Sequence, residues 1–244
     1  MPENLPKQES RFLNNLLWLL ALVAAFYGTN YGAGLIARAL HFAPLTAALL
    51  GEVVILLLVL LFVWLDRGGF SNLGLLGRWE SWDSAAVAGI VVVQWVGSFI
   101  TAAILQVTGL FRASQGKPVA ALFRSFGNYT GSEFVLLALV VALAAGVSEE
   151  LLFRGYLMTR LERARVPGWA CVGISALVFG LVHVNGYGIL PALSKAIWMG
   201  IPAGLYFWRR RNLGPLIIAH TLIDFLGFLL TFLVLKVAPG LPGL

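Results

Sequence analysis

Three short motifs place ionisable side chains inside apolar sequence. They are Glu149-Glu150-x-x-x-Arg154, Phe179-x-x-x-His183 and His220-x-x-x-Asp224. A carboxylate beside imidazoles can act as a general base on water and can direct hydrogen bonds at a reaction intermediate. A charged side chain at the centre of a bilayer costs about 2.5–3.5 kcal/mol, so such groups usually serve a function or a partner. The motifs therefore predict a chemical site within the apolar part of the chain.

The first motif divides by helical spacing into a structural pair and a free carboxylate. Glu150 and Arg154 are four residues apart and share a helix face, which favours an ion pair. Glu149 points about 100° away from Glu150 on the same helix. We therefore expect Glu150 and Arg154 to stabilise the helix and Glu149 to carry the chemistry.

The second and third motifs hold the histidines. Phe179 lies one turn before His183 and is expected to form a wall of its pocket. His220 and Asp224 share a helix face, so Asp224 can orient His220 or bind a ligand together with it. Each histidine taken alone is as well explained by a packing role. Glu52, near the start of another apolar stretch, is interpreted as the structural partner of some other polar group or as a residue near a helix end.

The three motifs are expected to lie at one depth. At about 1.5 Å per residue, Glu149 lies roughly 15–20 Å from the end of its helix. His183 lies about 20 Å from Trp169, and His220 about 10 Å from Leu213. A free glutamate and two histidines at overlapping depth predict one polar cavity that opens toward the cytoplasm.

The composition identifies a lipid bilayer as the surroundings. Of the 244 residues, 59% are hydrophobic and 11% are charged, against roughly 45–50% and about 25% in soluble domains. These proportions exclude an ordinary cytosolic enzyme and a nucleic-acid-binding domain. We expect an all-α transmembrane bundle of about seven spans, within a range of six to eight. The expected spans are Phe12–Tyr27 with a continuation to Leu40 after a glycine-rich break, Pro44–Leu65, Ser84–Val107, a helix from Ser132 without a breaker between Gly155 and Pro167, Trp169–Val184, Leu190–Trp208 and Leu213–Val237.

The charges predict how these spans are oriented. The first span is interpreted as an anchor rather than a cleaved signal peptide, because its apolar run is long and further spans follow. Most of the 17 basic residues fall on the side of the N-terminus, which predicts a cytoplasmic N-terminus and a C-terminus on the opposite side. A re-entrant or amphipathic piece around Phe111–Gly127 would change which basic residues lie on each side of the membrane. We expect one membrane domain, with helices one to three and their loops in residues 1–131 and a catalytic core in residues 132–244.

In order, spacing and placement on apolar helices, the three motifs resemble the signature of the CPBP family of intramembrane endopeptidases, which includes the CAAX prenyl proteases. The resemblance extends from about Ser132 to Phe225. It implies a core of helices four to seven like that of the family, in which Glu149 and His183 activate a water molecule. It also implies structural roles for Glu150 and Arg154.

The third motif departs from the family in one position. The resemblance implies that His220 and Asp224 stabilise the oxyanion, but the best-known enzyme of the family has Asn in place of Asp224. A carboxyl group donates a hydrogen bond only when it is protonated. Asp224 is therefore expected either to donate in that form or to fix the tautomer of His220, which would then be the sole side-chain donor.

Two other chemistries are open to nearby residues. Glu149, His183 and His220 can be combined into a zinc site with one position left for water. The usual His-Glu-x-x-His motif is absent, and we expect the metal-free form, with no cofactor. Ser175 stands in a Gly-Ile-Ser-Ala sequence that resembles the Gly-x-Ser-Gly of rhomboid serine proteases, but small residues in membrane helices more often mark close packing.

Together these features predict an intramembrane endopeptidase that cleaves a membrane-associated polypeptide. The alternative is a non-enzymatic protein of the same family with an immunity, chaperone or transport role. The expected substrates are a prenylated C-terminal Cys-a-a-X peptide, a membrane-anchored precursor or an export tag. Nucleic acid is not an expected partner. Basic residues at 160–165 and 209–211 are expected to contact anionic lipid headgroups or an acidic substrate tail, and the single cysteine, Cys171, excludes an intrachain disulfide.

Overall fold

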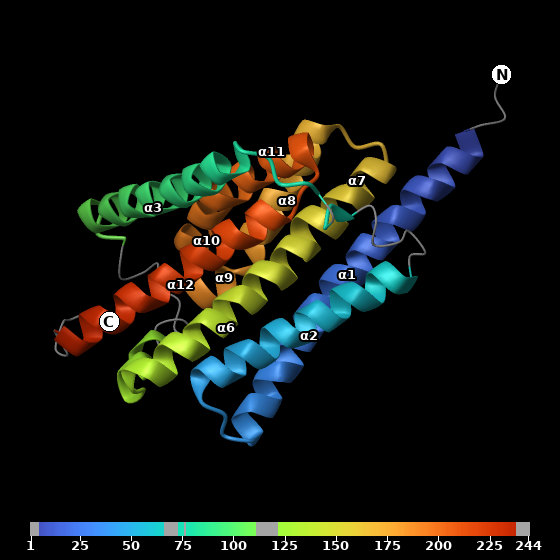
Figure 1. Ribbon diagram of the computed structural model, residues 1–244. Helices are drawn as coiled ribbons and strands as arrows, with labels where there is room; N and C mark the ends of the chain where they lie inside the picture. The colour runs from blue at the N-terminus through green and yellow to red at the C-terminus, as the bar shows by residue number, and fades with distance from the viewer. Residues whose placement is uncertain (1–4, 66–72, 76, 111–121, 238–244) are drawn as a thin grey trace.

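The computed structural model describes residues 5–65, 73–75, 77–110 and 122–237, which contain helices and loops and no strand (Figure 1). This confirms the predicted all-helical class. The long helices are α1 (Leu5–Ala39), α2 (Pro44–Leu65), α3 (Asp83–Val107), α6 (Gly131–Glu150), α8 (Gly168–Val182), α11 (Ile201–Arg210) and α12 (Gly214–Val237). The shorter elements are the 3-10 helix η2 (Phe126–Asn128), the π-helices η3 (Leu151–Met158) and η4 (Ala196–Gly200), and the α-helices α7 (Thr159–Arg163), α9 (Val184–Tyr187) and α10 (Ile189–Lys195).

Helices α1 and α2 form a hairpin along one side of the bundle (Figure 1). α1 is one continuous helix, so the predicted glycine-rich break after Tyr27 was wrong. In apolar surroundings a broken helix leaves backbone groups unsatisfied at several kcal/mol each, which exceeds the roughly 1 kcal/mol cost of a helical glycine. α2 begins at Pro44 and ends at Leu65, as predicted.

The helix that carries the first motif continues through α6, η3 and α7, from Gly131 to Arg163. A capping box fixes its start. The Thr130 hydroxyl accepts a hydrogen bond from Glu133 N, and the Glu133 carboxylate accepts one from Thr130 N at 3.1 Å. This reciprocal cap satisfies two backbone donors. The lack of a helix breaker before Pro167 predicted the length of this helix, but not the π-helical turns of η3.

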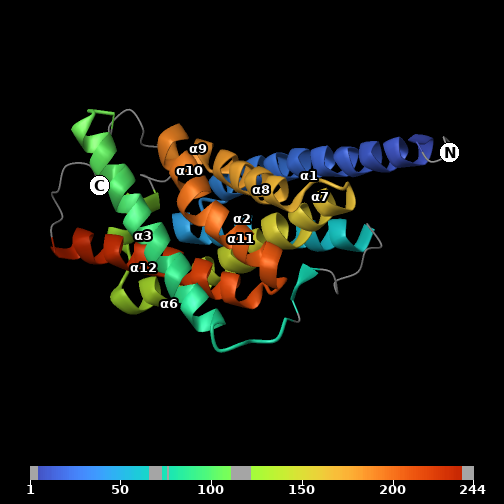
Figure 2. The same cartoon turned by 90° about the horizontal axis from the view of Figure 1, so that it is seen from above.

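The central position of α6 brings the motif-bearing helices together. α6 packs between α2 and α12, while α3 crosses α12 and contacts α10 and η4 (Figure 2). α8 packs against η4 and α11. α10, η4 and α11 form one helical run over the predicted sixth span. As a result, the end of α6 packs beside the first turns of α12, and the ring of Phe179, near the end of α8, is centred 6.0 Å from the His220 ring.

Two glycines permit the close approach of these helices. A Cβ atom at Gly146 would lie 2.6 Å from the hydroxyl oxygen of Thr221 and 2.9 Å from the carbonyl oxygen of Ile217, so α6 and α12 meet at backbone distance. A Cβ atom at Gly200 would lie 2.9 Å from Cα of Ala176, which brings η4 equally close to α8. Small residues commonly allow such contacts between membrane helices. The contact at Gly146 lies one turn before the first motif.

The apolar helices support an integral membrane protein. Four described helices are long and apolar enough to cross a bilayer, namely Pro44–Leu65, Asp83–Val107, Gly131–Arg163 and Gly214–Val237. Leu17–Phe26 and Gly168–Val182 are apolar but shorter. The count of seven spans, the domain boundary and the orientation of the termini stay predictions. Residues 111–121 of the predicted re-entrant piece lie outside the described residues.

Candidate active site

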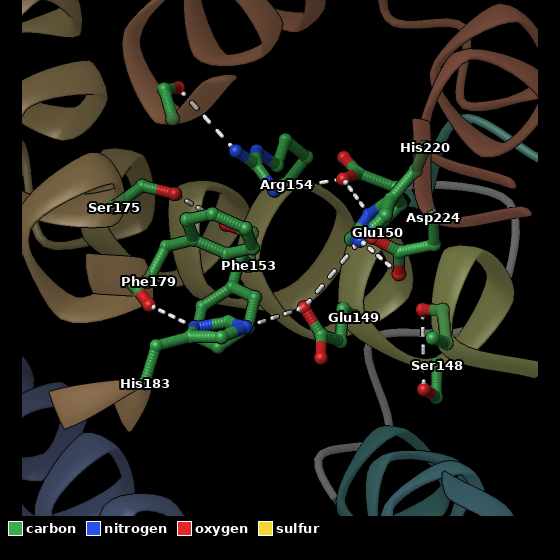
Figure 3. Close-up of polar contacts among 12 residues, drawn as sticks. Ser148, Glu149, Glu150, Phe153, Arg154, Ser175, Phe179, His183, His220 and Asp224 are labelled. Atoms are coloured by element: carbon green, nitrogen blue, oxygen red, sulfur yellow. Dashed lines mark hydrogen bonds and ion pairs between the residues drawn. The ribbon is translucent and has the colours of Figure 1, made fainter. Parts of the chain in front are cut away.

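The three motifs meet around the carboxylate of Glu149 (Figure 3). Glu149 lies in the last turn of α6, His183 directly follows α8, and His220 lies in α12. Glu149 Oε2 is 3.8 Å from His183 Nε2 and 3.8 Å from His220 Nε2. This oxygen is buried, and no described group forms a hydrogen bond with it. Three helices thus present three groups to one point, as their depths predicted.

The orientation of His183 is fixed by its own helix. His183 Nδ1 lies 2.7 Å from the carbonyl oxygen of Phe179. A carbonyl oxygen only accepts hydrogen bonds, so Nδ1 carries a proton and donates it. The neutral ring therefore presents the lone pair of Nε2 to Glu149. The Phe179 ring is centred 4.8 Å from the imidazole and packs against it, as expected of a pocket wall.

Glu150 joins the first motif to the third. Its Oε1 accepts hydrogen bonds from Arg154 Nη1 and from His220 Nδ1, each at 2.8 Å. The side chains of Glu150 and Arg154 are fully buried. Arg154 also donates to the carbonyl oxygen of Gly200 at 3.4 Å and lies over the Phe179 ring, 4.7 Å from its centre. The predicted ion pair is present, and it also holds one nitrogen of His220.

Asp224 lies at the other nitrogen of the His220 ring. Its Oδ2 is 3.5 Å from His220 Nε2, the atom that also faces Glu149. The sequence had offered Asp224 as the group that fixes the tautomer of His220, but Glu150 makes the contact to Nδ1. The packing of α6 on α12 brings Glu150, and not Asp224, to Nδ1 of His220. Three carboxylates surround the ring, and their charge can balance an imidazolium.

Glu52 has the polar partner that the sequence analysis expected. Ser148 Oγ donates a hydrogen bond to Glu52 Oε2 at 2.6 Å. Ser148 directly precedes Glu149, and Glu52 interacts electrostatically with Glu149. α2 therefore contributes a further carboxyl group beside the site.

The comparison with protein families bears on these residues directly. Residues 131–226 match the family model described as type II CAAX prenyl endopeptidase Rce1-like. We therefore refer to residues 131–226 as the Rce1-like segment. The match covers 96 of the 244 residues, includes all three motifs and is consistent with the CPBP family. It points to a peptidase in a membrane. Comparisons with curated proteins and with solved structures returned no match.

Ser175 lies within the Rce1-like segment but has a structural partner. It is fully buried, and its hydroxyl donates to the carbonyl oxygen of Phe153 at 3.0 Å. Phe153 belongs to η3, so this bond joins α8 to the π-helical part of the first-motif helix. The geometry supports the packing interpretation of Ser175.

Two residues of the Rce1-like segment near the site were not identified from the sequence. Lys195 Nζ lies 4.5 Å from the centre of the Tyr187 ring, and that ring is centred 5.7 Å from the imidazole of His183. Lys195 interacts electrostatically with Glu149 and Asp224. Lys195 could have been identified from the sequence, because it is the one basic residue in the apolar run 189–208.

The donor atoms around Glu149 are spaced more widely than the ligands of a zinc ion. In the part of the chain that the structure describes, no group of three or more His, Cys, Asp or Glu side chains has the arrangement of a metal site. Donors that share a tetrahedral zinc ion at about 2.0–2.2 Å lie roughly 3.3 Å apart. Glu149 Oε2 is 3.8 Å from each histidine nitrogen. As placed, these donors do not fit zinc.

Proposed function

We propose that the protein is an intramembrane endopeptidase in which Glu149 is the general base. It hydrolyses a peptide bond of a membrane-associated protein. A prenylated C-terminal Cys-a-a-X peptide is the first substrate to test, because the matching family model carries that description. The observation that carries the proposal is a carboxylate oxygen of Glu149 without a described hydrogen-bond partner, 3.8 Å from two imidazole nitrogens.

In the proposed mechanism a water molecule bridges Glu149 and His183. Hydrogen bonds of water to such acceptors are about 2.8 Å long, so one oxygen atom can bridge the 3.8 Å between Oε2 and Nε2. Both atoms accept, so the water donates one hydrogen to each. This orients the water and leaves its lone pairs free to attack a substrate carbonyl group.

Hydrolysis then follows in two steps. The water oxygen bonds to the carbonyl carbon, its proton passes to Glu149, and the electron pair of the C=O bond moves onto the carbonyl oxygen. In the second step the C–N bond breaks as the C=O bond re-forms, and the leaving nitrogen takes the proton from Glu149. The doubly protonated ring of His220 donates from Nε2 to the oxyanion during the first step.

Asp224 acts as a positioning residue in this scheme. Its carboxylate, 3.5 Å from His220 Nε2, and that of Glu150 at Nδ1 supply the counter-charge for the charged ring. An ionised carboxylate cannot itself donate to an oxyanion. In this assignment Asp224 neither donates to the oxyanion nor fixes a tautomer of His220, and it acts as a counter-charge to the ring.

The first experiment compares purified wild type with Glu149→Gln on an internally quenched farnesylated Cys-a-a-X peptide. The glutamine keeps the shape of the side chain but cannot take the proton, so kcat is expected to fall about 10²–10⁴-fold. Glu80→Gln serves as the control, because Glu80 is exposed and pairs with Arg210 away from the motifs. Bound metal is quantified in each sample, and activity is expected to survive chelation.

Each outcome has a separate meaning. Equal cleavage by wild type and Glu149→Gln would refute the role of Glu149. Loss of activity on chelation that one equivalent of zinc restores would replace the glutamate mechanism by a metal-dependent one. Cleavage of a membrane-anchored precursor, but not of the prenylated peptide, would keep the mechanism and change the substrate class.

A further inference from the structure

The proposed oxyanion lacks a second donor among the motif residues. Oxyanion sites are usually built from converging hydrogen-bond donors. His183 Nδ1 and the Nη1 and Nη2 atoms of Arg154 already donate within the protein, whereas Arg154 Nε is buried without a described partner. Glu149 and Asp224 only accept when they are ionised. Among the described motif atoms, His220 Nε2 is the donor that faces Glu149 Oε2, where the proposed water binds.

Lys195 brings further N–H groups to the same region. It is partly buried at the end of α10, with its ammonium group over the Tyr187 ring. The Tyr187 ring in turn packs beside His183, which holds the proposed water. Among the described residues Lys195 forms no ion pair within 4.0 Å, although it interacts electrostatically with Glu149 and Asp224. Its charge therefore acts on Glu149 and Asp224 from a distance and not through a direct ion pair.

The chain turns sharply to place this lysine. Gly188, between α9 and α10, has a φ of 87°, a conformation that glycine adopts without strain. The turn folds α10 back against α8, so Lys195 reaches the residues that follow α8. An ammonium group in an apolar run is costly and calls for an anion to offset it.

We propose that Lys195 is a catalytic residue that donates a hydrogen bond to the oxyanion, together with His220. The proposal rests on the proposed peptidase function. When the water oxygen bonds to the carbonyl carbon, the C=O electron pair moves to oxygen and a full negative charge develops there. The ammonium group has three donors on a flexible stem, and the Tyr187 ring holds it beside the site through a cation–π contact until that charge forms.

Kinetics distinguish this role from two others that a lysine can have here. An oxyanion donor acts in the transition state, so its loss lowers kcat and leaves KM unchanged. An anchor for an anionic group of the substrate acts equally in the ground state, so its loss raises KM. A structural counter-charge to Glu149 and Asp224 affects the fraction of folded protein.

The test uses Lys195→Met and Lys195→Gln, which remove the charge in two ways, and Lys195→Arg, which keeps it. Lys236→Met is the matched control, because Lys236 is exposed and donates to the carbonyl oxygen of Gly127. The neutral variants are expected to lose about 10²–10³-fold in kcat at unchanged KM. Lys195→Arg is expected to lose less, and the control to keep the wild-type constants. Thermal unfolding in detergent corrects each rate for folded protein.

A second measurement requires no turnover. Binding of a farnesylated peptide with a phosphonamidate in place of the scissile amide is compared with binding of the parent amide peptide. Wild type should prefer the phosphonamidate, since its tetrahedral anion resembles the intermediate. Lys195→Met should lose that preference by the same factor as kcat, with unchanged affinity for the amide.

The possible results distinguish a failure of the Lys195 proposal from a failure of the proposed peptidase function. A raised KM with wild-type kcat, or wild-type kcat per folded molecule in both neutral variants, would overturn the role of Lys195. So would a wild type without preference for the phosphonamidate. Full activity of Glu149→Gln in the parallel assay would instead mark the failure of the proposed function itself.

Discussion

The buried pair of Glu150 and Arg154 permits a double-mutant test of how the site is stabilised. Both side chains are fully buried and joined at 2.8 Å. Removing one partner of such a pair leaves an uncompensated charge and costs about 3–5 kcal/mol, whereas apolar replacement of both is often neutral. We expect Glu150→Leu and Arg154→Met each to lower the free energy of unfolding by about 3–5 kcal/mol. The double variant should lose only about 1–3 kcal/mol, because His220 Nδ1 remains without its acceptor.

Reversible unfolding in mixed detergent micelles measures the four free energies of this cycle. The double variant is expected to recover stability but to stay at least about tenfold less active, since a misplaced catalytic group can cost about 10²-fold. The pair of Arg210 and Glu80, in which the glutamate is 53% exposed, provides the control cycle, with little coupling expected. If the two losses add in the double variant, Glu150 and Arg154 do not stabilise one another and the reasoning fails.

Two further substitutions test packing around the site. Ser175→Ala should keep wild-type kcat and lose about 0.5–1.5 kcal/mol of unfolding free energy, because only the bond to Phe153 O is removed; a collapse of kcat in a folded variant would revive the serine alternative. Gly146→Ala should lose about 1–3 kcal/mol and most of the activity, since its Cβ would lie 2.6 Å from Thr221 Oγ1 and displace α12. Gly173→Ala, whose Cβ would meet nothing within 4 Å, should behave as wild type in the same unfolding and kinetic assays.

The helices were predictable where local sequence determines them. α2 has the predicted bounds, and α3 begins one residue earlier than predicted. Long apolar runs with a proline at the start or a turn at the end leave few alternatives in lipid. The π-helical turns of η3 and η4 were not predictable, because an i→i+5 turn has no sequence periodicity of its own and depends on what neighbouring helices contact.

The site was predictable in its members more than in its connections. Helical spacing separates Glu149 from Glu150 and pairs Glu150 with Arg154, and both features are present. Spacing cannot show which face of α12 meets α6, so the hydrogen bond from His220 to Glu150 was missed. The sequence used Lys195 only as one of the basic residues that indicate membrane orientation. Its approach to the site depends on the turn before α10, which the sequence analysis did not predict.

The charges of the site explain why acidic and basic groups are gathered in apolar surroundings. Three carboxylates, Glu149, Glu150 and Asp224, face the charged groups of Arg154 and Lys195 and the His220 ring. In the proposed mechanism, the first step neutralises Glu149 and creates an oxyanion nearby. The net charge of the site is therefore constant while the negative charge moves by a few ångströms. Charged groups that are in place before the reaction stabilise both states without rearrangement, which is the condition under which electrostatic stabilisation is most effective.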